Sequence, residues 1–230
     1  MTHLLSKSKY IRGLQCERAL WLDVHEPRLA RYTAEQMRRF DLGREFEYSF
    51  KDTFPNGIDI SAELKRNVDA YPVRTSELLD KGDGVDLFEA GFLYDDVLVL
   101  ADVVHQNPDG TLDIYEVKSG FTLSETYRRD AALQHYVISH CRRIHSFSIV
   151  YNGVDGENGI NGQDGPFAIV DLTEELAAEG DRIAANIAEM KTIVRATAEP
   201  DPPTGQHCLT PYACPYQHHC QQGIRQLALF

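Results

Sequence analysis

The sequence predicts a mixed α/β (α+β) fold, in which one mixed sheet is flanked by helices. Residues 87–94 and 97–118 are rich in β-branched and aromatic side chains and predict a meander of three antiparallel strands. A capping box, Thr122-Leu-Ser-Glu125, starts a helix that is expected to run to about residue 143. The remaining expected elements are strands at 146–151 and 166–171 and an amphipathic helix over 173–195.

The composition is that of one large globular domain, or of one domain with an appendage. The 230 residues carry a net charge of −12, which argues against non-specific coating of nucleic acid. The charge is uneven, because residues 1–44 carry +4 and the remainder carries −16. A basic entrance beside an acidic metal site would suit a phosphate-bearing substrate, although a solvated helix surface is the commoner role of such charges.

No stretch of the chain predicts membrane insertion or secretion. No apolar run is long enough to span a bilayer, and residues 1–13 lack the apolar core of a signal peptide. We therefore expect a cytoplasmic protein without a membrane partner. Five cysteines in such a chain do not predict disulfides.

The stretch 97–120 carries the most informative pattern. Asn107-Pro108-Asp109-Gly110 predicts a tight turn between two strands. Because side chains alternate along a strand, Asp102 ends an apolar row on the first strand, and Glu116 and Lys118 share a face of the second. The hairpin is therefore expected to bring Asp102, Glu116 and Lys118 together on a largely buried surface.

Such a group of charges has two interpretations. Buried carboxylates are costly unless they are paired or bind a metal ion. An isolated Glu-x-Lys is more often a structural ion pair than a functional site. The additional Asp102 on the neighbouring strand favours a site that binds a divalent cation and positions a water molecule.

Two helices are expected before the meander. The first covers Ser6 to about residue 24 and includes Cys16, and the second runs from Thr33 to before residue 55. Glu47 lies near the apolar side of the second helix. It is either a boundary residue of an amphipathic helix or a third carboxylate delivered to the sheet. Glu89, on the first strand of the meander, faces either the site or solvent, and we expect solvent.

The helix after the capping box carries an inward-facing stripe of side chains. Its members, at helical spacing, are Tyr127, Ala131, Gln134, Ile138 and Cys141. A buried Gln134 amide needs partners, which the carboxylates of the site or a bound phosphate could supply. A local hydrogen bond with Asp130 is the alternative. Cys141 is expected to be a small buried apolar residue and not a ligand.

The last quarter of the chain contains a glycine-rich stretch and a cysteine-containing tail. Five glycines at 153–165 predict a flexible hairpin loop. Residues 199–205 interrupt the regular secondary structure. Cys208, Cys214 and Cys220 follow at even gaps that suit neither a zinc finger nor a zinc ribbon. With Cys16 the count reaches four, which can hold an iron–sulfur cluster. Zinc is a second alternative, because zinc also accepts histidine ligands and three histidines lie in the tail, namely His207, His218 and His219. Free thiols are the third alternative.

In combination, these motifs resemble a known superfamily. Asp102, then Glu116-Val117-Lys118, then a helix with Gln134 and Tyr136, resembles the RecB-like branch of the PD-(D/E)XK nucleases. The upstream and downstream cysteines are similar to those of its iron–sulfur members, the CRISPR-associated RecB-like exonucleases and the AddB-type helicase-nucleases. Residues 6–22 also resemble the start of these proteins, and the resemblance covers nearly the whole chain.

The resemblance implies a restriction-endonuclease-like sheet and a role for each matching residue. Asp102 and Glu116 would ligate Mg²⁺ or Mn²⁺ together with the backbone carbonyl of Val117. Lys118 would orient or help deprotonate the attacking water. Glu47, which follows Gly43-Arg-Glu-Phe46, stands where the branch often has a histidine ligand, and we expect it to ligate the metal.

The helix motif departs from the family pattern. Gln134 would support the site, and Tyr136 would belong to the same motif. The family spacing is Gln-x-x-x-Tyr, whereas Tyr136 follows Gln134 by two residues.

The resemblance also implies a domain plan, cofactors and partners. Residues 1–230 would form a single RecB-like nuclease domain, in which 1–32 and 196–230 together form an iron–sulfur subdomain. A structural [4Fe-4S] cluster, or alternatively Zn²⁺, would join the two termini through Cys16, Cys208, Cys214 and Cys220. The substrate would be DNA, single-stranded or with a free end, and a protein partner in a repair or CRISPR adaptation complex is expected. The rival functions are a nucleic-acid-binding module without cleavage and a zinc-binding scaffold protein.

Overall fold

The computed structural model describes residues 4–82, 84–153 and 167–221 of the chain. The chain divides into two compact units, which are described separately. The sheet unit contains residues 1–7 and 39–183, and the tail unit contains residues 8–38 and 184–230. Among the described helices, none combines the length and the apolar character that crossing a bilayer requires.

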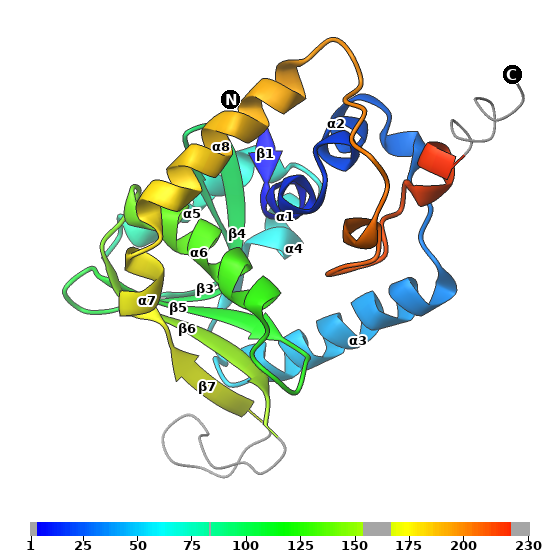
Figure 1. Ribbon diagram of the computed structural model, residues 1–230. Coiled ribbons are helices and arrows are strands. Elements are labelled where there is room, and N and C mark those ends of the chain that lie inside the picture. The colour runs from blue at the N-terminus through cyan, green and yellow to red at the C-terminus, as the bar shows by residue number, and fades with distance from the viewer. Residues whose placement is uncertain (1–3, 83, 154–166, 222–230) are drawn as a thin grey trace, which may run out of the picture. The chain divides into compact units, whose positions relative to one another are not determined.

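A seven-stranded mixed sheet organises the sheet unit (Figure 1). Its order is β2-β3-β4-β5-β6-β7, and β1 pairs with β4 outside this path. The strands are β1 (Leu5–Ser6), β2 (Ile58–Asp59), β3 (Asp86–Tyr94), β4 (Val97–Gln106), β5 (Leu112–Lys118), β6 (Ile144–Asn152) and β7 (Phe167–Asp171). The predicted mixed sheet flanked by helices is confirmed.

The central three strands form the predicted antiparallel meander. β3 and β4 are joined through Asp95 and Asp96, which both have positive φ, at 49° and 59°. This conformation matches the right-handed twist of a tight hairpin. β5 and β6 are parallel, and the helix α6 (Glu125–Ser139) connects them, whereas β6 and β7 are antiparallel.

The two edges of β4 are occupied differently along its length. The β4–β5 ladder runs from Gln106 only to the pair Val103–Tyr115. At the start of β4, β1 pairs in parallel with Val97 and Leu98. Since β3 holds the opposite edge of β4 throughout this stretch, β1 lies on the edge that β5 has left. Asp102 therefore lies at the fork between β5 and β1.

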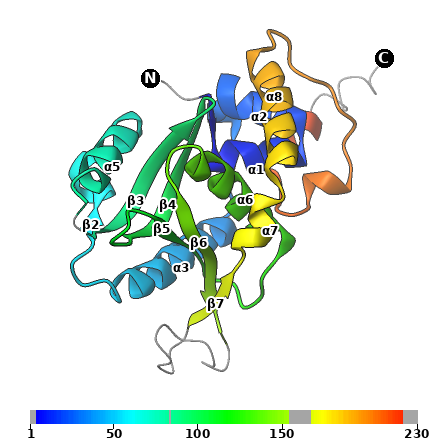
Figure 2. The same ribbon diagram turned by 90° about the vertical axis from the view of Figure 1, so that its left-hand side faces the viewer.

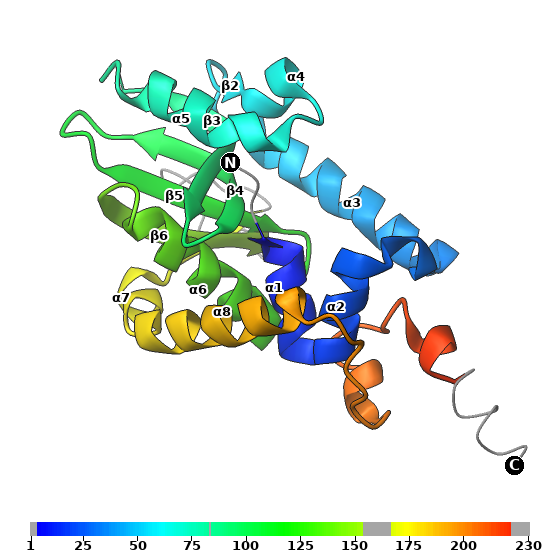
Figure 3. The same ribbon diagram turned by 90° about the horizontal axis from the view of Figure 1, so that it is seen from above.

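Helices cover both faces of the sheet (Figure 3). The helices within the unit are α4 (Ile60–Leu64), a 3₁₀ turn (Val68–Ala70), α5 (Tyr71–Leu79), α6 and α7 (Thr173–Ala177). Figure 2 shows α5 alongside β3, against which it packs, and α6 packs against β3, β4 and β6. The C-terminal part of α3 (Ala34–Lys51) also belongs to this unit.

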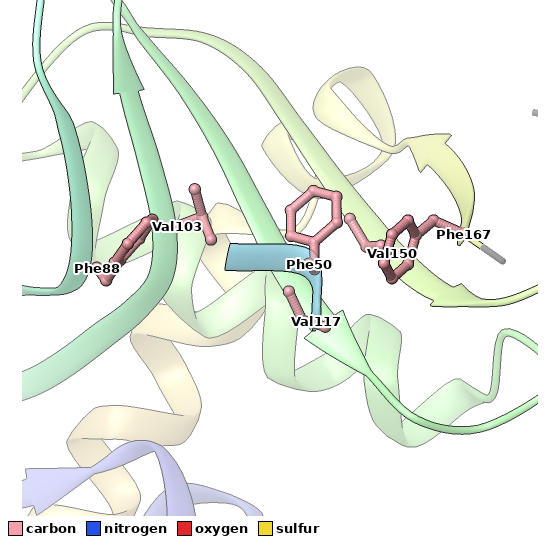
Figure 4. Close-up of a cluster of buried hydrophobic side chains, with 6 residues drawn as sticks. All are labelled: Phe50, Phe88, Val103, Val117, Val150 and Phe167. Atoms are coloured by element: carbon pink, nitrogen blue, oxygen red, sulfur yellow. The ribbon is translucent and has the colours of Figure 1, made fainter. Parts of the chain in front are cut away.

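The face of the sheet toward α3 is apolar. Phe50 of α3 lies completely buried in a cluster with Phe88, Val103, Val117, Val150 and Phe167. Figure 4 shows the Phe50 ring between Val103 on one side and Val150 and Phe167 on the other. Because side chains alternate, this packing leaves Asp102, Glu116 and Lys118 for the opposite face, where α6 supplies Asp130.

The tail unit combines chain segments from both ends of the sequence. Its helices include most of α1 (Lys7–Gln15), α2 (Glu17–His25), a 3₁₀ turn (Pro27–Leu29), most of α8 (Gly180–Arg195) and a second 3₁₀ turn (Gln206–Cys208). The Trp21 indole N–H donates to the Ala196 carbonyl at 2.9 Å. The Asn186 amide donates to the Tyr10 hydroxyl at 2.9 Å.

Several predicted element bounds differ from those observed. The helix expected from Ser6 is interrupted at Cys16, whose extended backbone precedes α2. Ser124 caps α6 instead of Thr122, because its hydroxyl accepts from the Tyr127 N–H. The helix expected over 173–195 is two helices, α7 and α8. The predicted hairpin loop falls largely on 154–166, which lies outside the described residues.

Candidate functional site

Asp102 is the residue around which the candidate site is built. It is buried, with 7% of its surface exposed. Its Oδ2 atom accepts a hydrogen bond of 2.7 Å from the Val117 N–H. A backbone donor that the forked ladder would leave unpaired is thereby satisfied. Its Oδ1 atom lies 4.0 Å from the Lys7 ammonium.

Asp102 forms one carboxylate group with two glutamates. Glu47 of α3, Glu89 of β3 and Asp102 each offer an oxygen, and these oxygens lie within 4.8 Å of one another. Around Mg²⁺, with ligands at about 2.1 Å, ligand oxygens lie about 3 to 4.2 Å apart. A small contraction would thus bring these three oxygens into the coordination shell of a small hard cation.

Glu89 reaches this group through an unusual backbone conformation. Its φ is +54°, a region that non-glycine residues seldom adopt. The β3–β4 ladder is interrupted between the pairs Phe88–Val103 and Ala90–Ala101, where Glu89 and Asp102 stand opposite each other. The expectation that Glu89 faces solvent is wrong, because only 23% of its side chain is exposed. Backbone strain of this kind is concentrated at functional sites.

Lys51 neutralises part of this group. Its ammonium donates to Glu89 Oε1 at 2.9 Å and also pairs with Glu47 Oε1. The Lys51 side chain is 6% exposed. Burial lowers the pKa of Lys51, but the attraction of Glu89 and Glu47 outweighs it, so the pKa is raised and the ammonium stays charged.

A second group of charges lies on the α6 side of Asp102. Glu116 is completely buried, and its Oε1 accepts from Lys7 at 2.8 Å and also from Lys118. Lys118 donates to Asp130 Oδ2 at 2.6 Å. The Lys7 ammonium lies 3.9 Å from Asp130. Asp102 therefore belongs to two clusters. The first contains Glu47 and Glu89, and the second contains Lys7, Glu116, Lys118 and Asp130.

The combined network has more negative than positive charge. It contains five carboxylates and three ammonium groups, which leaves −2 when all are ionised. The pKa of Asp102 is well above its usual range, because burial and the Glu116 carboxylate both disfavour its charge. Burial likewise raises the pKa of Asp130 and Glu89. The Glu116 pKa is lowered despite burial, because two ammonium groups contact it.

Buried polar atoms without partners gather beside the second group. Among the described residues, Glu116 Oε2, Asp130 Oδ1 and both amide atoms of Gln134 are buried and lack a hydrogen bond. The Gln134–Asp130 hydrogen bond that was the local alternative is therefore wrong. Since buried polar groups are nearly always satisfied, these atoms are available to a polar or charged partner such as a water molecule or an ion.

The predicted site residues are placed as follows. Glu47 lies with Asp102 in the first group of charges. Glu116 and Lys118 lie in the second group, on the α6 side of Asp102. Val117 contributes its N–H to Asp102. Tyr136 of α6 packs its ring edge-on against Tyr94, with ring centroids 5.8 Å apart.

Three participants were not expected from the sequence, namely Lys7, Lys51 and Asp130. The fourth, Glu89, was expected to face solvent in preference to the site. Lys51 follows Glu47 by four residues, a spacing at which helical side chains meet, so a signal for it existed. Asp130 precedes Gln134 by the same spacing. Lys7 and Glu89 depend on how β1 and β3 meet β4, which no local pattern encodes.

Cys16 and the three cysteines of the C-terminal tail all belong to the tail unit. The Cys214 N–H donates to the Cys208 carbonyl at 2.8 Å. Cys16 and Cys214 both pack on a small apolar cluster of Ala19, Leu22 and Tyr216. Burial raises the pKa of the Cys16 thiol, and Cys208 and Cys220 add to this by charge repulsion. The pKa of Cys214 is raised by burial and by repulsion from Cys16 and Cys220.

The spacing of the cysteine sulfur atoms differs from the spacing of ligands around a zinc ion. Among the described residues, no three Cys or His ligand atoms lie within 4.8 Å of one another. Zn–S bonds of about 2.3 Å place tetrahedral ligands under about 4 Å apart. A four-iron cluster holds its sulfur ligands further apart than one ion does.

Comparisons with known proteins leave the family open. No family model and no curated protein matches the sequence. Among solved structures, the chain is similar to the crystal structure of SSO0001, with a TM-score of 0.41 and 11% identity over 81% of this chain and 75% of that one.

Proposed function

We propose that the protein is a metal-dependent deoxyribonuclease of the PD-(D/E)XK type, with a restriction-endonuclease-like sheet and a structural [4Fe-4S] cluster in its tail unit. The observation that carries the proposal is the network centred on Asp102. Its net charge of −2, when all groups are ionised, equals the charge that one divalent cation neutralises. Carboxylate oxygens are the ligands that Mg²⁺ and Mn²⁺ prefer.

The donor atoms support a cation beside Asp102. Glu47, Glu89 and Asp102 would hold it, and Glu116, whose buried Oε2 has no hydrogen-bond partner among the described residues, would be the further ligand that the resemblance implies. When bound, such an ion would polarise a phosphoryl group and lower the pKa of a coordinated water. The raised pKa of Asp102 and Glu89 fits a site whose carboxylates need a cation to be fully ionised.

The side chains beside the carboxylates have distinct roles in phosphodiester hydrolysis. Lys118, fixed by Glu116 and Asp130, would orient the attacking water and stabilise charge that develops on the phosphate. Its raised pKa keeps it an ammonium, since the attraction of Asp130 and Glu116 outweighs the effect of burial. A charged donor suits charge stabilisation better than proton abstraction.

The cysteines support a cluster in place of a single zinc ion. Charge repulsion from neighbouring cysteines contributes to the raised pKa of Cys16 and of Cys214, and among the described residues the thiols are spread more widely than zinc ligands would be. Cys16, Cys208, Cys214 and Cys220 would each bind one iron. Because Cys16 is distant in sequence from the others, the cluster would stabilise the tail unit through metal-coupled folding.

A cleavage assay tests the proposal. Protein purified without oxygen is incubated with end-labelled single- and double-stranded DNA, with Mn²⁺, with Mg²⁺ or with a chelator. Asp102→Asn is the test variant, and Glu77→Gln, which alters an exposed glutamate of α5, is the matched control. We expect cleavage that needs the metal, is lost in Asp102→Asn and persists in Glu77→Gln.

Other outcomes point to the rival functions. DNA binding by the wild type without cleavage in either metal would indicate a binding module of the same architecture. One zinc ion per chain, no iron and no DNA binding would indicate a scaffold protein. Equal cleavage by wild type and Asp102→Asn would mean that a contaminating nuclease acts, and the proposal would be abandoned.

A further inference from the structure

The residue that carries a further inference is Lys7, which enters the site from outside the central hairpin. It directly follows β1, whose pairing of Ser6 with Leu98 fixes where it emerges. The N–H groups of Leu4 and Leu5 both donate to the Asp96 carbonyl, at 2.9 and 3.1 Å. Lys7 is thereby delivered to the fork beside Asp102.

Lys7 contacts each carboxylate on the α6 side of the site. Its ammonium lies 2.8 Å from Glu116, 3.9 Å from Asp130 and 4.0 Å from Asp102. Its side chain is 28% exposed, against 18% for Lys118 and 6% for Lys51. Of the three lysines in the network, Lys7 is therefore the one most open to an incoming molecule.

Lys7 shares its carboxylate partners with a second lysine. Lys118 already donates to Glu116 and to Asp130. A second ammonium group beside Lys118 adds like-charge repulsion, which the attraction of Asp130 and Glu116 outweighs. Lys7 can transfer from Glu116 to an anion that arrives with a cation, because the cation then replaces Lys7 at the carboxylates.

We propose that Lys7 is a substrate-binding residue that contacts a non-bridging oxygen of the phosphate at the scissile bond. This inference rests on the proposed nuclease function and adds a second cation to Lys118. Lys118 stays with Glu116 and Asp130, and Lys7 moves between Glu116 and the phosphate. No covalent step is involved.

The test separates phosphate binding from structural support. Lys7→Met, Lys7→Arg and Lys81→Met are compared with the wild type, since Lys81 is an exposed lysine of the same unit. Binding of a fluorescein-labelled single-stranded oligonucleotide is measured in Ca²⁺ at several salt concentrations, and cleavage is measured in Mn²⁺. Thermal unfolding and Mn²⁺ affinity are recorded for each variant.

The expected pattern follows from one charge-assisted contact to phosphate. Lys7→Met should lower kcat/KM by about 10- to 100-fold and reduce the slope of log affinity against log salt by about 0.7. Its Mn²⁺ affinity should stay equal or rise, because Glu116 is released. Lys7→Arg should recover most of the activity, and Lys81→Met should behave as wild type.

Three results would overturn the inference. One is a Lys7→Met variant with wild-type cleavage and an unchanged salt slope. Another is an equal loss of cleavage in Lys7→Met and Lys7→Arg together with lowered thermal stability, which would mean that Lys7 has only a structural role. If the wild type neither binds nor cleaves DNA in any metal, the proposed function fails first, and the role of Lys7 fails with it.

Discussion

The Asp102 carboxylate accepts a hydrogen bond of 2.7 Å from the Val117 N–H, across the gap where β5 has left β4. One oxygen thus completes the backbone hydrogen bonding of the sheet, while the other faces the Lys7 ammonium. The fork therefore places a buried carboxylate where strand pairing has stopped. Its two oxygens have separate tasks, which two substitutions can distinguish.

Asp102→Asn and Asp102→Ala should differ in stability. The Asn side-chain oxygen can still accept from the Val117 N–H, and it removes a carboxylate whose pKa burial has raised, so the free energy of unfolding should stay within about 1 kcal/mol of wild type. Ala leaves that N–H unpaired and should cost about 1–3 kcal/mol. Urea unfolding of the metal-free protein measures both. Equal stability of the two variants would contradict the structural role of the Val117 contact.

Glu89→Gln tests the glutamate that was expected to face solvent in preference to the site. It removes the charge of one of the three clustered carboxylates but keeps the side-chain shape. We expect Mn²⁺ affinity to fall by at least about tenfold, a typical loss when a metal site is altered. Isothermal titration with Mn²⁺ measures this, with Glu77→Gln as the control. Unchanged affinity in Glu89→Gln would remove Glu89 from the metal site.

Gly91→Ala tests the packing of α5 on β3. A Cβ at residue 91 would lie 2.5 Å from Tyr71 Cβ and 2.9 Å from the Tyr71 carbonyl carbon. Because backbone atoms cannot easily move aside, the variant should be about 1–3 kcal/mol less stable than wild type. Gly180→Ala is the control, since a Cβ there meets nothing within 4 Å. A Gly91→Ala variant as stable as Gly180→Ala would contradict the observed packing.

Cys208→Ser tests the cluster in the tail unit. It should lower the iron and sulfide content of anaerobically purified protein and lower the thermal stability, because cluster binding is coupled to folding. Cys141→Ser is the control, since the Cys141 thiol donates to the Leu93 carbonyl of the sheet unit at 3.6 Å. Its iron content should equal that of the wild type. Zinc in place of iron in the wild type would contradict the cluster.

The His145–Asp113 pair predicts a pH dependence of stability. The ring nitrogen of His145 lies 2.7 Å from Asp113, and this hydrogen bond and charge raise the pKa of His145. A raised folded-state pKa stabilises the fold fully below the unfolded value of about 6.5 and loses this effect as pH rises through the folded value. The stability difference between wild type and His145→Asn should therefore be larger near about pH 6 than near about pH 9. Urea unfolding at both pH values measures it, and an equal difference would contradict the pair.

Local patterns predicted the centre of the fold and part of the site. The alternation of side chains along two strands placed Asp102 and Glu116 on one face, and turn residues located the hairpin between them. The stripe on α6 correctly marked Gln134 as buried. These features depend on residues close in sequence, so a single sequence encodes them well.

The remaining parts of the site depend on long-range pairing. The two residues of β1 have no pattern of their own, and their pairing with β4 is what delivers Lys7. The positive φ of Glu89 arises where the β3–β4 ladder is interrupted, and no residue preference signals it. The break at Cys16 likewise interrupts a segment that looks continuously helical. Tertiary packing determines each of these features.

The most direct test of the central claim is the number of Mn²⁺ ions that the chain binds at the Asp102 network. Electron paramagnetic resonance of free Mn²⁺ during a titration measures it, in wild type and in Asp102→Asn. We expect one tightly bound ion per chain in the wild type, in keeping with a network charge of −2 when all groups are ionised, and its loss in Asp102→Asn. No tightly bound ion in the wild type, or the same binding in both proteins, would contradict it.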